Sequence, residues 1–130
     1  MNIGDTLESK SLSVSQEFIN DYADICGDYN TLHVDVEGMK DHPIFGGTIA
    51  HGTINVEPVL QAICTAQGTT WPNDGTEIDL QFRAPVKPGM TISSDLKVKE
   101  KQGNDLVCDM QVVDQNGGPC VRGTVQIVMP

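Results

Sequence analysis

The stretch TINVEPVLQAICTAQ, residues 53–67, is apolar nearly all the way round and decides the fold class. A surface helix has one apolar stripe, whereas a helix with apolar residues on most sides has to be buried. We therefore predict a buried helix over residues 53–67. Pro58 lies inside it, so either the regular helix begins near Glu57 with Pro58 at its first position, or the helix is kinked at Pro58.

Downstream of Gly75 the pattern changes to an alternation of apolar and polar residues, which is typical of strands. The segments expected to form strands are 77–86, 91–101, 105–114 and 121–129. The breaks between them, at 87–89, 101–105 and 114–119, have the composition of hairpin turns. We therefore predict an antiparallel meander of four strands that wraps the buried helix. The chain has 130 residues, enough for one core, so we expect a single α+β domain over residues 1–130.

Upstream of the buried helix, residues 14–26 (VSQEFINDYADIC) have the spacing of an amphipathic helix. Ser15 is placed to cap its start, and Gly27 is placed to end it. Residues 29–51 then have the composition of a loop, with room for one short helical turn near 36–40. A loop of this length in a compact domain is often functional, so candidate chemistry is expected here.

Composition restricts the classes of partner. The net charge is −10, from 18 acidic and 8 basic residues. Such a surface disfavours binding to nucleic acids and to anionic membranes, because both require basic patches. No apolar run reaches membrane-spanning length, and the N-terminus has no signal-peptide pattern. The four cysteines are far apart and match no ligand spacing, as expected for free thiols in a reducing cytoplasm.

The segment 26–35 (CGDYNTLHVD) brings Asp28, Asn30 and His33 close together just past the expected end of a helix. A general base that works near neutral pH needs a group of this kind, and an Asp and a His on one loop can face one cleft. Asn30 between them can hold one of them by hydrogen bonds. The alternative is an Asx-type turn that ends the helix and leaves His33 exposed. The spacing alone favours this alternative.

A second signal is His51-Gly52, directly before the buried helix. N–H groups at a helix N-terminus lack partners and favour negative charge, and a glycine lets a ligand approach closely. Such an N–H suits a thioester carbonyl that becomes an enolate oxyanion. Alternatively, Gly52 only permits a tight turn into the helix. The histidines at 33, 42 and 51 match no ligand spacing, so we expect no metal.

Three motifs resemble those of the MaoC-like, (R)-specific enoyl-CoA hydratases: ADICGDYNTLHVD (23–35), GGTIAHGTI (46–54) and LQFRAPVKPGM (80–90). They occur in the family order and together anchor most of the chain. The resemblance implies a hotdog fold, in which a curved antiparallel sheet wraps the long central helix. It also implies a homodimer or higher homo-oligomer, and a reaction without a cofactor.

The resemblance further implies roles for individual residues. Asp28 and His33 would hold one catalytic water, supported by Asn30 and His51. The Gly52 N–H would receive the thioester oxygen. The reaction would be (R)-specific hydration of trans-2-enoyl thioesters, or dehydration of (R)-3-hydroxyacyl thioesters.

The ligand implied by the resemblance is a thioester of CoA or of an acyl-carrier protein, which carries phosphate. In so acidic a chain the few basic residues are informative. Arg83 and Lys87 are the candidates for phosphate contacts, and Lys40 is a weaker one.

Three departures from the family pattern affect the site. Thr31 stands where the family usually has proline, Gly46-Gly47-Thr48 replaces a bulkier residue and a proline, and Pro58 interrupts the central helix. They bear on substrate length and rate more than on the type of reaction. Two other functions stay open: a thioesterase on the same scaffold, and a non-catalytic module that binds acyl thioesters.

Overall fold

The structure is a computed structural model that describes all residues, 1–130. Its elements, in chain order, are β1 (Ser11–Val14), α1 (Gln16–Cys26), α2 (Thr31–Val34), α3 (Val36–Met39), the 3-10 turn η1 (Gly52–Asn55), α4 (Val56–Gln67), β2 (Glu77–Phe82), β3 (Met90–Gln102), β4 (Asp105–Val113) and β5 (Pro119–Ile127).

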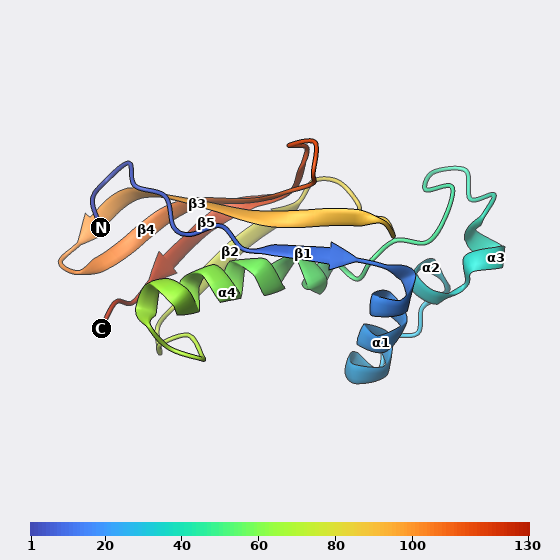
Figure 1. Ribbon diagram of the computed structural model, residues 1–130, viewed down its shortest axis with the longest axis horizontal. Coiled ribbons are helices and arrows are strands. Elements are labelled where there is room, and N and C mark those ends of the chain that lie inside the picture. Colours follow the sequence, from blue (N-terminus) through green and yellow to red (C-terminus); the bar gives the residue numbers. More distant parts are fainter.

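The five strands form one antiparallel sheet in the order β1-β3-β4-β5-β2. Helix α4 lies along one face of this sheet, while α1, α2 and α3 gather at one end of the molecule (Figure 1). Alternation places every second residue of a strand toward α4. In β4, for example, Leu106, Cys108 and Val112 are buried, and Asp109 is exposed. This is the predicted α+β arrangement of a hotdog fold, with the central helix held against an antiparallel sheet.

The buried helix predicted over residues 53–67 is confirmed. It begins as the 3-10 turn η1 and continues as α4 without a break. Val59, Ala62 and Ile63 of α4 are at most 1% exposed. Pro58 is the third residue of α4, in the first turn, where a backbone N–H has no intrahelical partner to lose. The α-helix therefore starts two residues before the proline and runs through it.

The predicted meander is wrong in one connection. The hairpins β3–β4 and β4–β5 form as expected, but β2 pairs with β5 at the far edge of the sheet and makes no hairpin with β3. The segment 83–89 instead connects β2, at one edge of the sheet, to β3 on the other side of β4 and β5. Pro85 and Pro88 lack the N–H that a ladder requires. The buried Val86 accepts a hydrogen bond from Ala50 N–H at 2.7 Å, which fixes this crossing against the loop before η1.

The N-terminal region contains one strand that the sequence pattern did not predict. β1 pairs with β3, with Leu12 opposite Ile92. The helix expected next is confirmed as α1, and Ser15 Oγ accepts from Phe18 N–H at 3.0 Å, as an N-cap does. The short turn expected near 36–40 is α3. None of the helices combines the length and the apolar character needed to cross a bilayer.

Candidate active site

The loop that carries Asp28 is fixed by its own backbone. Gly27 ends α1 with a φ of 74°, a left-handed conformation that favours glycine. Asp28 Oδ1 accepts from Asn30 N–H at 3.1 Å, and Asn30 Oδ1 accepts from Leu32 N–H at 3.0 Å. Asn30 therefore holds the Asp28 carboxylate through its backbone N–H, while its own side chain caps α2.

His33, in α2, has its proton position set by the loop before η1. Its Nδ1 lies 2.8 Å from the Ile49 carbonyl oxygen. A carbonyl only accepts, so Nδ1 donates and Nε2 of the neutral ring carries a lone pair. Nε2 faces Asp28 Oδ2 at 3.7 Å, too far for a direct hydrogen bond. Two acceptors at this separation are suited to a small donor such as water between them.

The exposure of the two side chains differs. The His33 side chain is 12% exposed and the Asp28 side chain is 52% exposed. The ring is therefore held inside the protein, while the carboxylate stands at the solvent side. The structure thus brings together the two residues that the sequence had paired, with the histidine oriented and the aspartate accessible.

His51 supports both members of this pair. It is 3% exposed, and its Nε2 donates to the Asp28 carbonyl oxygen at 2.8 Å. Its ring stacks on the His33 ring with centroids 3.9 Å apart and an interplanar angle of 27°. The Tyr22 ring lies 5.0 Å away on a tilted plane. His51 Nδ1 is buried without a hydrogen-bond partner.

The histidine cluster is poorly shaped for a metal ion. Asp28, His33 and His51 each place one ligand atom within 4.8 Å of the others. However, the two rings are stacked, so their in-plane lone pairs run side by side and do not converge on one point. His42 lies outside this group, and its Nδ1 accepts from Ile44 N–H at 3.2 Å within its own loop. That the site works without a metal stays a prediction.

Gly52 opens η1 at the wall of a cleft of about 310 Å³, which His33 also lines. As the first residue of the turn, Gly52 has no intrahelical acceptor for its N–H. A Cβ at this position would lie 2.9 Å from two carbons of the Phe82 ring, so the ring packs closely on Gly52 and only a glycine fits beneath it without moving it. Gly52 and the oriented imidazole of His33 thus line the same cleft.

The two predicted phosphate ligands are placed apart. Arg83 lines the cleft with His33 and Gly52, and its Nη2 donates to Gln81 Oε1 at 2.9 Å. Lys87 lines a neighbouring hollow of about 540 Å³ together with Lys40. Phe45 lines both spaces, so the two adjoin there. Lys40, the weaker candidate from the sequence, therefore lines the same hollow as Lys87.

Two polar residues at the site were missed by the sequence analysis. Asn55 is 4% exposed, lines the cleft and donates from Nδ2 to the Gly52 carbonyl oxygen at 3.0 Å. Gln16, the first residue of α1, donates from Nε2 to the His33 carbonyl oxygen at 2.8 Å. Asn55 could have been noticed as a polar residue inside the mostly apolar stretch 53–67. No local pattern pointed to Gln16.

Comparison with known proteins shows the family to which the chain belongs. The family model described as "MaoC like domain" matches residues 1–116. The 3-hydroxyacyl-thioester dehydratase Z of Mycobacterium tuberculosis is 35% identical over 105 residues, which cover 77% of this chain and 69% of that protein. The match includes most of both chains.

Solved structures show the same fold. The unliganded R-hydratase PhaJ1 from Pseudomonas aeruginosa superposes with a TM-score of 0.80 at 28% identity, covering all of this chain and 83% of that chain. The (R)-hydratase from A. caviae, described as involved in PHA biosynthesis, has a TM-score of 0.84 at 18% identity and covers 98% of that chain. Together with the family match, they lead to one conclusion: the chain belongs to the MaoC-like domain family and is a hydro-lyase.

Proposed function

We propose that the protein catalyses the (R)-specific hydration of trans-2-enoyl thioesters and the reverse dehydration of (R)-3-hydroxyacyl thioesters. One observation carries the proposal: the His33 Nε2 lone pair and Asp28 Oδ2 face each other at 3.7 Å beside a cleft. A water that donates one hydrogen to each atom satisfies both acceptors and has its oxygen lone pairs free to attack.

In the hydration direction, the water oxygen bonds to the β-carbon of the enoyl thioester while the pair takes one of its protons. A proton then passes from the pair to the α-carbon. One water is consumed and the pair ends as it began, so no cofactor has to supply or remove electrons. His51 and Asn30 hold the geometry during this exchange, His51 through the Asp28 carbonyl and Asn30 through the cap of α2.

Addition to the β-carbon places negative charge on the thioester oxygen. In this proposal the Gly52 N–H, at the start of η1 and α4, receives this charge, which the helix N-terminus also favours. A donor of this kind is typically worth roughly 3 kcal/mol in the transition state. The role of Gly52 in this proposal is therefore that of the oxyanion donor.

The thioester is one of CoA or of an acyl-carrier protein. The cleft adjoins, at Phe45, the hollow lined by Lys40 and Lys87. In a chain with a net charge of −10, two lysines against one carboxylate, that of Glu37, give this hollow a local positive charge suited to the phosphates. Arg83 is placed nearer the reacting end of the ligand. Replacing Lys40 and Lys87 with alanine is expected to raise KM for a CoA thioester and to leave kcat nearly unchanged.

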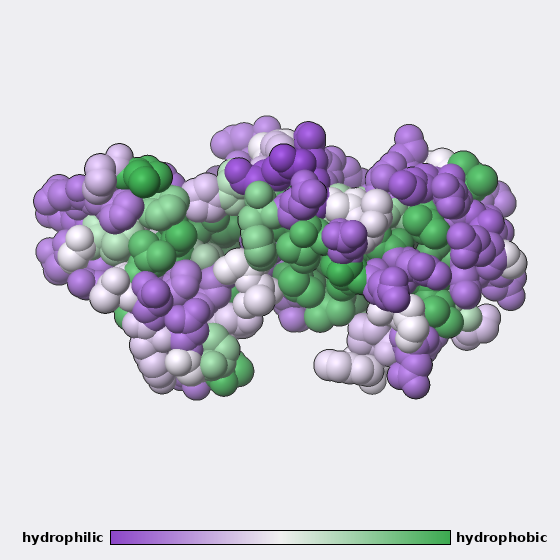
Figure 2. All heavy atoms as spheres, turned by 180° about the vertical axis from the view of Figure 1, so that it is seen from behind, coloured by the Kyte–Doolittle hydropathy of each residue, from purple (hydrophilic) through white to green (hydrophobic).

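We also propose that residues 1–130 act as one domain in a homodimer joined through β2. β2 is an edge strand, and Phe82 at its end is 60% exposed. Figure 2 shows apolar side chains gathered near the middle of the face seen from behind, with polar side chains around them. A second copy that pairs with the β2 edge would satisfy its backbone groups and cover apolar surface. Light scattering that gives the mass of one chain would contradict this part of the proposal.

The test of the function is incubation of the protein with crotonyl-CoA. Hydration removes the conjugated double bond, so absorbance falls without release of thiol, and the product is (R)-3-hydroxybutyryl-CoA. Release of free CoA from acyl-CoA without loss of the enoyl absorbance would select a thioesterase. Binding of acyl-CoA in a calorimeter with neither reaction would select a non-catalytic module.

A further inference from the structure

The two loops that carry the site are joined by direct hydrogen bonds. Ile49 N–H donates to the Leu32 carbonyl oxygen at 2.9 Å, and His33 Nδ1 donates back to the Ile49 carbonyl oxygen at 2.8 Å. The position of the His33 ring therefore depends on the position of the loop before η1. A displacement of that loop moves the acceptor that orients the ring.

A side-chain network on α1 holds both loops at once. Gln16 Nε2 donates to the His33 carbonyl oxygen at 2.8 Å and to Asn20 Oδ1 at 2.9 Å. Gln16 Oε1 accepts from the Thr48 hydroxyl. Thr48 is 5% exposed and directly precedes Ile49. The amide of Gln16 thus contacts the backbone of His33 with one end and the loop before η1 with the other.

The network coincides with two sequence departures. Thr31 and Thr48 stand at positions where the resembled family usually has proline, and Gly46 and Gly47 precede Thr48. Proline fixes φ and lowers the freedom of a loop, whereas threonine and glycine leave the loop freer. The geometry of these two loops has to be fixed by other contacts in this chain. Gln16 and Thr48 supply contacts of that kind from inside the protein.

We infer that Gln16 and Thr48 are positioning residues that hold His33 in its working orientation, in place of the missing prolines. The inference rests on the proposed hydratase function, because it assigns His33 a catalytic role. Gln16 and Thr48 do not touch the Asp28 carboxylate or the imidazole, so they act through the His33 backbone and through Ile49. Misplacement of a catalytic group by about 1 Å can cost roughly 100-fold in rate.

Four substitutions separate hydrogen bonding from packing. Gln16→Leu removes all three bonds of the amide, and Gln16→Glu keeps an acceptor for Thr48 but offers no N–H to the His33 carbonyl. Thr48→Val keeps the shape but removes the hydroxyl, whereas Thr48→Ser keeps the hydroxyl. With crotonyl-CoA, we expect kcat to fall about 10- to 100-fold for Gln16→Leu, Gln16→Glu and Thr48→Val. We expect Thr48→Ser to stay within about threefold of wild type in kcat.

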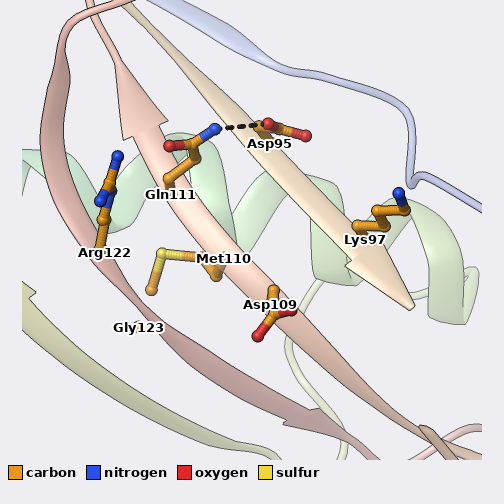
Figure 3. A pocket seen from close by; sticks show the side chains of 7 residues that line it. All are labelled: Asp95, Lys97, Asp109, Met110, Gln111, Arg122 and Gly123. Carbon is orange, nitrogen blue, oxygen red and sulfur yellow. Dashed lines mark hydrogen bonds between the residues drawn. The ribbon is translucent and has the colours of Figure 1, made fainter. Parts of the chain in front are cut away.

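Gln16 and Thr48 are hydrogen-bonded to each other, so the effects of their substitutions on kcat should not add. The double variant Gln16→Leu/Thr48→Val should therefore lose no more than the worse of its single variants. A matched control is Gln111→Leu, which also removes a glutamine amide and its hydrogen bond, here to Asp95 Oδ2 at 2.8 Å. This pair lies on the face of the sheet away from α4 (Figure 3), and neither residue lines the cleft or the lysine hollow, so the kcat of Gln111→Leu should equal that of wild type.

A readout independent of activity separates failure of the inference from failure of the proposed function. In hydrogen exchange followed by mass spectrometry, Gln16→Leu should speed exchange in peptides covering 29–35 and 47–52 and leave the β4–β5 hairpin unchanged. If wild type does not hydrate crotonyl-CoA, the proposed function is wrong, and this result still reports whether the network orders the loops. Unchanged kcat and unchanged exchange in Gln16→Leu would overturn the inference, as would equal kcat in Thr48→Val and Thr48→Ser.

Discussion

The substitution Gly52→Ala tests whether the start of η1 is a binding surface or only a turn. Gly52 does not have a positive φ, so alanine meets no backbone strain there. Its Cβ would instead lie 2.9 Å from two carbons at the far end of the Phe82 ring. Carbon atoms pack at roughly 3.5–4.0 Å, so the ring has to retreat by about 0.6–1.1 Å.

This retreat should cost little stability. Phe82 is 60% exposed, and its ring can swing toward solvent. We therefore expect the free energy of unfolding to change by less than about 1 kcal/mol. The methyl group and the displaced Phe82 ring, however, both crowd the wall of the cleft at Gly52, where the proposed thioester oxygen would bind. Loss of one oxyanion donor typically costs 100- to 1,000-fold in rate, so we expect kcat/KM to fall by about 100-fold.

The assay is crotonyl-CoA hydration, measured together with thermal unfolding, for Gly52→Ala, Phe82→Ala and the double variant. If the methyl group blocks the N–H, the double variant stays as slow as Gly52→Ala, although the clash with the ring is gone. Recovery of activity in the double variant would show that only the displaced ring mattered. Wild-type activity in Gly52→Ala would refute the oxyanion role altogether.

Three further predictions concern packing and chemistry elsewhere in the chain. His51→Phe keeps a stacked ring but removes the hydrogen bond to the Asp28 carbonyl, so turnover should fall roughly tenfold while the unfolding temperature stays close to that of wild type. Gly123→Ala places a Cβ on a backbone carbonyl oxygen of β2, so urea unfolding should show a loss of about 2 kcal/mol or more. Burial raises the pKa of the Cys108 thiol to about 11, so this thiol stays protonated near neutral pH. Iodoacetamide should therefore label the exposed Cys26 well before the buried Cys108, and peptide mass spectrometry measures this order.

Local sequence patterns were sufficient to predict the central helix and both ends of α1. The continuous apolar surface of residues 53–67 requires burial whatever the rest of the chain does, and Ser15 and Gly27 act through bonds within a few residues. The same holds for the hairpins β3–β4 and β4–β5, whose turns are short. These elements depend on interactions that are close in sequence, and the prediction of each was confirmed.

The position of β2 could not be predicted in this way. Its pairing with β5 joins Glu77 to Gln126 and Phe82 to Val121, residues that are far apart in the chain. Alternation shows which face of a strand is buried but does not show which neighbour it pairs with. The turn-like composition of 87–89 favoured a hairpin, and only the packing of Val86 against the loop before η1 shows that the chain crosses the sheet.

In the candidate site, too, the features set by short-range interactions could be predicted and those set by long-range contacts could not. Asp28 lies in the turn before α2 and His33 lies within α2, so their approach follows from the short-range cap at Asn30. The orientation of the imidazole depends instead on Ile49, which is distant in sequence and is placed by the loop before η1. The role of Gln16 likewise depends on tertiary contacts that carry no local signature.

The central claim is that Asp28 and His33 act together on one water. The most direct measurement is kcat for crotonyl-CoA hydration in Asp28→Asn, His33→Gln and the double variant, each checked for wild-type thermal unfolding. We expect each single variant to lose about 1,000-fold or more, and the double variant to lose no more than the worse single one, because either loss disables the same pair. Near-wild-type hydration in either single variant, or losses that multiply in the double variant, would contradict the claim.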